Sequence, residues 1–151
     1  MNIATRLSAL NFLDNGGAIG VFPGGTVSTA QNPFGVPMDP GWRSFTAKMI
    51  TRSDAQVVPI FFEGHNSRLF QVASHIHYNL RMGLLIKEFK SKVGNPVKIA
   101  IGNPLSDTAI KSRSGNPRIL MDFLREETYK LSRTPLDNFN YGYEFESRYK
   151  I

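Results

Sequence analysis

The stretch that decides the fold reads Val21-Phe22-Pro23-Gly24-Gly25-Thr26-Val27-Ser28. Its first two residues end the short apolar run Ala18–Phe22, which predicts a buried strand, and Pro23 with two glycines halts that strand. Glycines let a backbone approach a ligand closely or adopt positive φ, and consecutive free N–H groups can hold an anion or an oxyanion. An ordinary strand-to-loop turn uses the same residue types, so the segment alone leaves both interpretations open.

Helix-like and strand-like stretches alternate around this segment, which predicts an α/β fold: a mixed β-sheet flanked by helices. Apolar residues at helical spacing predict helices before the glycine pair at 16–17, over 43–52, over 68–93 with a break near Ser74, and from Pro117. Asn116 suits the cap of that last helix, because its side chain can accept from free N–H groups. Two further apolar runs predict strands, Val57–Phe62 and Val97–Ile101.

Bulk composition favours one cytoplasmic globular domain. The chain has 151 residues, of which 41% are hydrophobic and 20% charged, and no stretch approaches the ~20 apolar residues of a membrane span. It contains no cysteine, which excludes disulfides and thiolate sites. The net charge of +6 fits an anionic membrane surface or a mildly basic soluble surface. The basic residues are dispersed and form no known motif, so we expect no nucleic-acid partner.

The motifs, taken in order, carry a family resemblance. Phe22-Pro23-x-Gly25-Thr26-x-Ser28 resembles the third block of the glycerolipid acyltransferase family, usually written F-P-E-G-T-R-S. Val57–Phe62 resembles its fourth block, an apolar V-P-hydrophobic strand. Further motifs are similar to a bacterial branch labelled hemolysin-like or lysophospholipid acyltransferase: Asp39–Trp42, Gly64–Phe70, an arginine near 81, and the V-x-I-x-I-G strand Val97–Gly102. The resemblance covers residues 3 to 131.

The resemblance implies transfer of a fatty acyl group from an acyl-coenzyme A or acyl-carrier-protein thioester to a lysolipid-type acceptor. It implies no bound cofactor, no metal and a cytoplasmic location, peripheral at the inner membrane. The expected substrate-binding residues are Phe22, Pro23, Gly24, Gly25, Thr26, Ser28, Asn66, Ser67 and Arg68. Gly24 and Val27 stand where the family has glutamate and arginine, which makes an amino-acid-derived or other lysolipid acceptor plausible in place of glycerol phosphate.

Family members catalyse with a histidine, four intervening residues and an aspartate, because a hydroxyl needs a base and the base needs an orienting carboxylate. The positions five residues after the three histidines hold Phe70, Leu80 and Met82. We therefore expect no catalytic residue in this chain. We expect residues 1–131 to be the later part of an acyltransferase domain whose N-terminal half carries the pair, and 132–151 to be a separate aromatic tail.

Two features keep alternatives open, and a third argues against a metal site. His65 and Ser67 form a His-x-Ser pair that could activate the serine, although Asn66 and Ser67 are also typical turn formers. Arg43, Arg68 and Arg81 could replace the missing positive charge or simply be solvated. His75 and His77 lie two apart, share no helix face and would lack further metal ligands.

The helix with Leu80, Leu84 and Leu85 could lie on a membrane or pack on the sheet with its basic residues in water. The tail alternates Phe139, Tyr141, Tyr143 and Phe145 with polar residues and glycine, which suits an added edge strand or a tail docked on an apolar groove. It could also contact lipid, pair with another chain, or cover a face left open by missing sequence. A non-catalytic lipid- or anion-binding module remains the alternative function.

Overall fold

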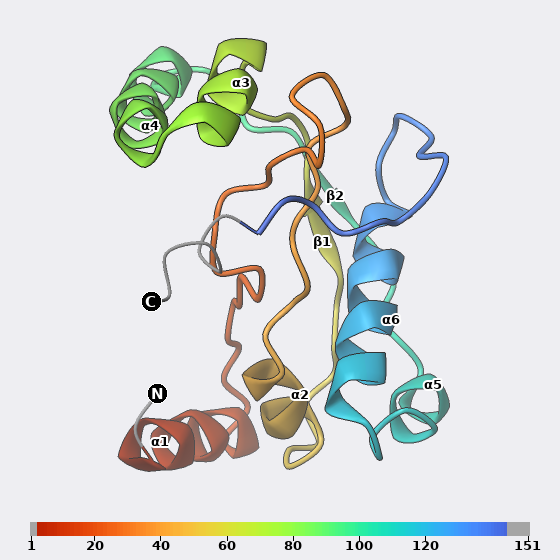
Figure 1. Cartoon of the computed structure of the whole chain (residues 1–151). Coiled ribbons are helices and arrows are strands. Elements are labelled where there is room, and N and C mark those ends of the chain that lie inside the picture. Colours follow the sequence, from red (N-terminus) through yellow and green to blue (C-terminus); the bar gives the residue numbers. More distant parts are fainter. Residues whose placement is uncertain (1–2, 145–151) are drawn as a thin grey trace. The chain divides into compact units, whose positions relative to one another are not determined.

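The computed structural model describes residues 3–144 and confirms the mixed α/β class (Figure 1). Its elements in chain order are α1 (Ile3–Asp14), α2 (Phe45–Ile50), β1 (Ile60–Phe62), α3 (Arg68–Ile76), α4 (Tyr78–Lys92), β2 (Ile99–Ile101), α5 (Asp107–Lys111) and α6 (Pro117–Tyr129). None of the helices within these residues combines the length and the apolar character that a bilayer crossing requires.

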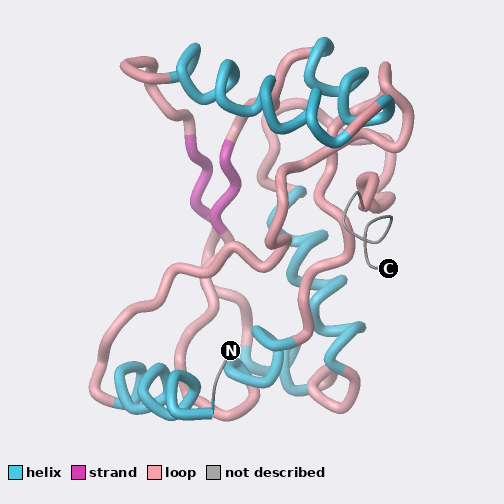
Figure 2. Tube along the Cα trace, turned by 60° about the vertical axis from the view of Figure 1, so that its left-hand side comes forward, coloured by secondary structure: helices cyan, strands magenta, loops and turns pink. Residues whose placement is uncertain are grey.

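The strands β1 and β2 pair side by side in a two-stranded antiparallel sheet (Figure 2). Gly102 N–H donates to Pro59 C=O at 3.0 Å, and Glu63 N–H donates to Lys98 C=O at 2.9 Å. Residue numbers therefore rise along one strand as they fall along the other, which makes the pair antiparallel. Both strands fall within the predicted apolar runs. The first is shorter than predicted and starts after Pro59, because proline has no N–H to give to a ladder.

The strand predicted over Ala18–Phe22 is wrong. Residues 18–22 form no regular structure, and Phe22 is 75% exposed. An apolar run becomes a strand only when a neighbouring strand takes up its backbone groups. Here the carbonyl of Phe22 instead accepts from Gly25 N–H, which closes a turn.

The helix predictions hold with local corrections. α1 ends as predicted at the glycine pair, where Gly16 has φ of 79° and Gly17 N–H donates to Phe12 C=O. The Asn116 cap is confirmed, since its side chain accepts from Arg118 N–H and Ile119 N–H. The break expected near Ser74 lies at His77, whose backbone is extended. Ser74 sits inside α3, where its hydroxyl donates to Phe70 C=O. The short helix α5 was not predicted.

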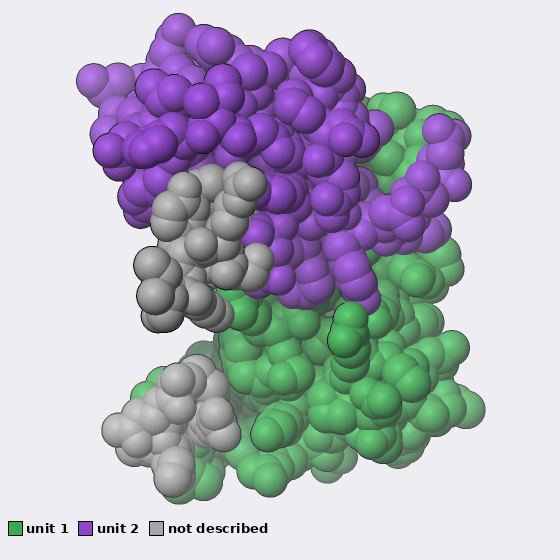
Figure 3. Space-filling model, viewed as in Figure 1, with its two compact units in different colours: residues 1–25, 42–61, 100–136 green, residues 26–41, 62–99, 137–151 purple. Residues whose placement is uncertain are grey.

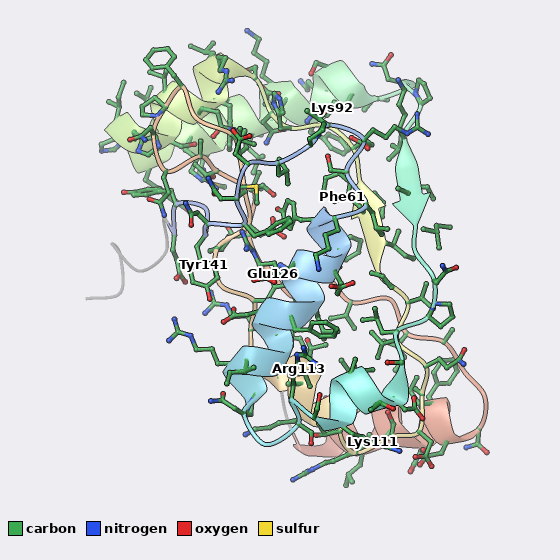
Figure 4. The ribbon with its side chains drawn as sticks, turned by 90° about the vertical axis from the view of Figure 1, so that its right-hand side faces the viewer. Phe61, Lys92, Lys111, Arg113, Glu126 and Tyr141 are labelled. Atoms are coloured by element: carbon green, nitrogen blue, oxygen red, sulfur yellow. The ribbon has the colours of Figure 1, made fainter. Side chains whose placement is uncertain are left out.

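The chain divides into two compact units (Figure 3). Unit 1 comprises residues 1–25, 42–61 and 100–136 and has an apolar core from α2, α5 and α6. That core consists of Ala47, Ile110, Leu120, Met121 and Leu124, with partly buried residues such as Trp42 and Val57 against it. Phe61 of β1, labelled in Figure 4, lies beside α6. Its ring meets the ring of Tyr129 on that helix edge-on, with the two ring centroids 5.4 Å apart. The sheet thus turns one side toward α6, and Ile60 and Ile101 on the other side are exposed.

Unit 2 comprises residues 26–41, 62–99 and 137–151, and its interior is unusually polar. The helices α3 and α4 pack together, with the loop 26–41 and the C-terminal segment beside them. Phe70 and Ala73 are its buried apolar residues on α3. Around them lie buried polar or charged side chains, namely Thr29, Asn66, Gln71, Ser74, Arg81 and Glu88. Such groups need internal hydrogen bonds to be stable away from water.

Candidate functional site

The part of the predicted site in unit 1 is a tight turn at residues 22–25. Gly25 N–H donates to Phe22 C=O at 3.3 Å, and Arg43 N–H donates to Pro23 C=O at 3.0 Å. Gly25 has φ of 65°, a left-handed conformation that residues with a Cβ rarely adopt. An added Cβ there would find its nearest neighbour, Arg43 Nε, at an ordinary 3.8 Å. Backbone conformation, and not space, therefore requires the glycine.

The part of the predicted site in unit 2 starts with the hydroxyl residues of the loop 26–41. Ser28 Oγ donates to a carboxylate oxygen of Asp39, and Thr29 N–H donates to Met38 C=O at 3.0 Å. The Ser28–Asp39 bond joins the third-block motif to the Asp39–Trp42 motif, two motifs that sequence spacing alone leaves separate. Thr26 is half-buried, and its hydroxyl takes part in none of the hydrogen bonds found within residues 3–144. Thr26 is thus the hydroxyl of this loop that is open to a ligand.

The side chain of Arg81 on α4 fixes this loop through hydrogen bonds. Its side chain is 5% exposed and donates to Thr29 Oγ1 at 2.9 Å, Ser74 Oγ at 2.7 Å and Val27 C=O at 3.3 Å. Its guanidinium carbon also lies 4.9 Å from the centre of the Phe70 ring. The alternative that the basic residues of this helix lie in water therefore does not hold for Arg81, whose side chain is buried. Its charge is used inside the fold and positions the backbone next to Ser28.

Asn66, Ser67 and Arg68 gather at the start of α3, and each is engaged inside unit 2. Ser67 caps α3 by accepting from Phe70 N–H, and its hydroxyl donates to Glu88. Asn66 accepts from Lys92 Nζ, and Arg68 donates to the carbonyl of Gly35 in the loop 26–41. Ser67 thus bonds a nearby backbone group, as the turn-shaping interpretation expects, whereas the Asn66 side chain bonds Lys92, which lies 26 residues away in the chain. Ser67 and Arg68 are exposed and Asn66 is buried, so Arg68 is the charged member of this group that a ligand can reach.

The carboxylate of Glu88 is the partner that sequence reasoning missed. Burial on its own would raise the pKa of Glu88, but hydrogen bonds from the Ser67 hydroxyl and N–H, together with the charges of Lys92 and Lys87, outweigh burial and hold the pKa below its usual value. Glu88 lies seven residues after Arg81, so both occupy one face of α4. That spacing of opposite charges was the available signal for a buried polar face.

All three histidines have structural partners. His65 Nδ1 lies 3.0 Å from Asn66 C=O, and His75 Nε2 lies 2.9 Å from Ala30 C=O. His77 Nδ1 accepts from Asn79 N–H at 3.1 Å and caps α4. Ser67 is bonded to Glu88, so the geometry gives no support to a His65–Ser67 nucleophile pair. Among the described residues, no group of three or more histidine, aspartate or glutamate side chains is arranged to hold a metal ion.

The C-terminal segment docks on the loop 26–41. Gly142 N–H donates to Asp39 C=O at 2.8 Å, and Tyr143 N–H donates to Thr29 C=O at 2.9 Å. The side chain of Gln31 donates to the carbonyls of Tyr141 and Gly142, and Tyr143 packs on the His75 ring with centroids 4.6 Å apart. The segment is not a regular edge strand, and of the alternatives left open by the sequence it is closest to a docked tail, held by hydrogen bonds to the loop 26–41. Phe145 lies outside the described residues.

A family model described as acyltransferase matches residues 5–138. The chain belongs to this acyltransferase family. The match includes the turn at 22–25, the loop 26–41, both strands and all the predicted site residues. It extends beyond residue 131 and stops before Gly142 and Tyr143, the two residues whose backbone docks on the loop. No curated protein and no solved structure matches the chain.

Proposed function

We propose that this acyltransferase-family chain serves the transfer of a fatty acyl group from an acyl-coenzyme A or acyl-carrier-protein thioester to a lysolipid-type acceptor. The thioester C–S bond breaks and an ester C–O or amide C–N bond forms. The proton of the acceptor passes through a general base to the departing thiolate. The observation that carries this proposal is the acyltransferase match over residues 5–138, which spans the whole quoted motif series.

Within this proposal, the segment 22–28 lies against the acceptor. The left-handed turn at Gly25 and the open hydroxyl of Thr26 support that role. Phe22 is exposed and suits contact with an acyl or lipid chain, while Pro23 and the buried Gly24 shape the turn. Ser28, Asn66 and Ser67 act by positioning the backbone, since their side chains are bonded inside the protein. Arg68 supplies an exposed positive charge to an anionic acceptor group.

The base is not one of the three histidines in this proposal. Each of their rings is bound to a neighbouring backbone group, and none is followed by an aspartate at the family spacing. The histidine–aspartate pair would then come from outside this sequence. The reaction would take place in the cytoplasm, at the surface of the inner membrane where lysolipids reside. It would use the thioester as co-substrate and need neither a bound cofactor nor a metal.

The test is thiol release from an acyl-coenzyme A with a panel of lysolipid acceptors, including amino-acid-derived ones. We expect no turnover from the chain as given. Where the reading frame extends upstream of Met1, we expect turnover from the extended form. In that form, Gly25→Val should lower kcat/KM by about a hundredfold, because a β-branched residue resists the left-handed turn. Gly115→Ala is the control, since an added Cβ there meets nothing within 4 Å.

Turnover by the chain as given, abolished by His65→Ala, would contradict this assignment and restore the His-x-Ser hypothesis. The second candidate, a non-catalytic lipid- or anion-binding module, rests on the missing His-x4-Asp signature in this sequence. It predicts lysolipid binding to the chain without thiol release in either form.

A further inference from the structure

Helix α4 buries charged side chains and exposes apolar ones, the reverse of an ordinary surface helix. The buried residues on it are Arg81 and Glu88, which carry full charges. On its outer side Met82, Ile86, Phe89 and Val93 recur at intervals of four, three and four residues, so they form one apolar stripe along the helix and its cap. All four are exposed, Ile86 by 62% and Phe89 by 72%.

Hydrogen bonds within unit 2 fix the orientation of α4 about its own axis. Arg81 is tied to Thr29, Ser74 and Val27 C=O, and Glu88 is tied to the N–H and hydroxyl of Ser67. Rotating the helix to bury the apolar stripe would break every one of these charged bonds. The outward position of Ile86 and Phe89 is therefore built into the packing of α3 and α4.

Exposed positive charge lies beside the apolar stripe of α4. Lys87 and Lys90 lie three residues apart and form an exposed basic edge along one flank of the stripe. Glu88, the acidic residue of α4, is buried and bonded, so the exposed side of this helix carries positive charge and no negative charge. An apolar stripe with lysines beside it is the arrangement of helices that lie in the interface of an anionic bilayer.

We propose that the outer face of α4, formed by Met82, Ile86, Phe89 and Val93 with Lys87 and Lys90, docks this protein on an anionic phospholipid bilayer. The helix would lie flat, with its apolar stripe at the boundary between headgroups and acyl chains and its lysines among the phosphates. A second copy of the chain would bring no acidic residue on this face to meet the lysines. This docking rests on the proposed function, in which the acceptor is a membrane lipid. It adds to that function the surface of the protein that contacts the membrane.

Vesicle flotation with the full chain tests the proposal without any acyl transfer, so a failed acylation assay does not decide it. We expect the chain to bind vesicles of phosphatidylglycerol and phosphatidylethanolamine more tightly than vesicles of phosphatidylcholine. Phe89→Ser should lower the partition coefficient by about tenfold, because a large apolar side chain no longer enters the interface. Leu80→Ser is the matched control, since Leu80 is 50% exposed on the same helix but lies off the stripe.

Lys90→Gln should lower binding to the anionic vesicles by about fivefold, as expected for one basic residue at the surface. Lys111→Gln is its control, on an exposed lysine of α5 in unit 1. A Phe89→Trp variant should be quenched by brominated lipid beyond the quenching of Trp42 in the parent chain, which reports insertion directly. Far-UV circular dichroism and thermal unfolding of each variant show that it is folded.

Three results would overturn the proposal: no binding of the parent chain to anionic vesicles, equal losses for Leu80→Ser and Phe89→Ser, or a Trp at position 89 that brominated lipid leaves unquenched. If sedimentation instead showed a dimer that Phe89→Ser dissociates, with no vesicle binding, the face would be assigned to self-association.

Discussion

Replacing Gly142 with alanine should detach the C-terminal segment from the loop 26–41. A Cβ at position 142 would overlap the carbonyl oxygen of Met38 and crowd that of Thr29. Both obstacles are backbone atoms, which cannot swing aside as a flexible side chain can. The loop carrying Thr29 and Met38 is itself fixed by their mutual hydrogen bond and by Arg81, so the segment is the part that moves.

The size of the effect follows from the contacts that would be lost. They are the Gly142–Asp39 and Tyr143–Thr29 backbone bonds, the bonds from Gln31, and the packing of Tyr143 on His75. A protein hydrogen bond contributes about 0.5–1.5 kcal/mol net, and the freed segment regains chain entropy that offsets part of the loss. We expect the free energy of unfolding to fall by about 1–3 kcal/mol.

Two measurements separate docking from general destabilisation. Urea unfolding gives the global change, and hydrogen exchange on peptides from residues 137–144 gives the local one. Protection of the Tyr143 amide should fall by about tenfold or more while the amides of α6 keep theirs. Gly41→Ala is the control, since nothing lies within 4 Å of a Cβ built there. Unchanged exchange and an unchanged urea midpoint in Gly142→Ala would refute the close approach of the two backbones.

Two further substitutions probe the polar interior of unit 2. Arg81→Ala should cost about 2–4 kcal/mol in urea unfolding by leaving buried acceptors at Thr29, Ser74 and Val27 unpaired, and Arg81→Lys should recover part of this, since one ammonium cannot span all three; equal losses in the two variants would contradict the bonding role. Because the folded pKa of Glu88 is lowered, its ionised form stabilises the fold above the unfolded pKa of about 4.3, and this contribution disappears as pH falls through the folded pKa. The stability difference between the parent chain and Glu88→Gln should therefore be constant near neutral pH and shrink below about pH 4 in urea titrations; a difference that grew on acidification would contradict the lowered pKa.

The helices were predictable where their signals are local. The Asn116–Pro117 start of α6 and the glycine stop of α1 act through neighbours within a few residues, and both are found as expected. α5 is one short turn of helix capped by Ser106, too brief to show periodicity. The segment 18–22 has the composition of a strand, but pairing depends on a second strand, which its own residues do not encode.

In the candidate site, too, features set by neighbouring residues were predictable and features set by residues distant in the chain were not. The turn at Gly25 follows from local residue types, because a Pro-Gly-Gly sequence favours a left-handed position there. The roles of Ser28 and Ser67 depend instead on Asp39 and Glu88, which lie 11 and 21 residues away in the chain. Spacing alone marked these serines as ligand contacts, whereas the folded chain uses their hydroxyls to join one segment to another.

The hardest element to predict was the one that carries the membrane proposal. Helical periodicity is ordinarily interpreted on the premise that the apolar side of a helix faces the core. In α4 that premise fails, since bonds from Arg81 and Glu88 outweigh the exposure of Ile86 and Phe89. Leu84 and Leu85 are only half-buried, and Leu80 is exposed, so the stripe inferred from the leucines was not the side that the fold selects. Charged side chains at a spacing of seven thus deserve the same weight as apolar ones when a helix borders a polar interior, because each buried charge requires its partners to be placed before the apolar side is assigned.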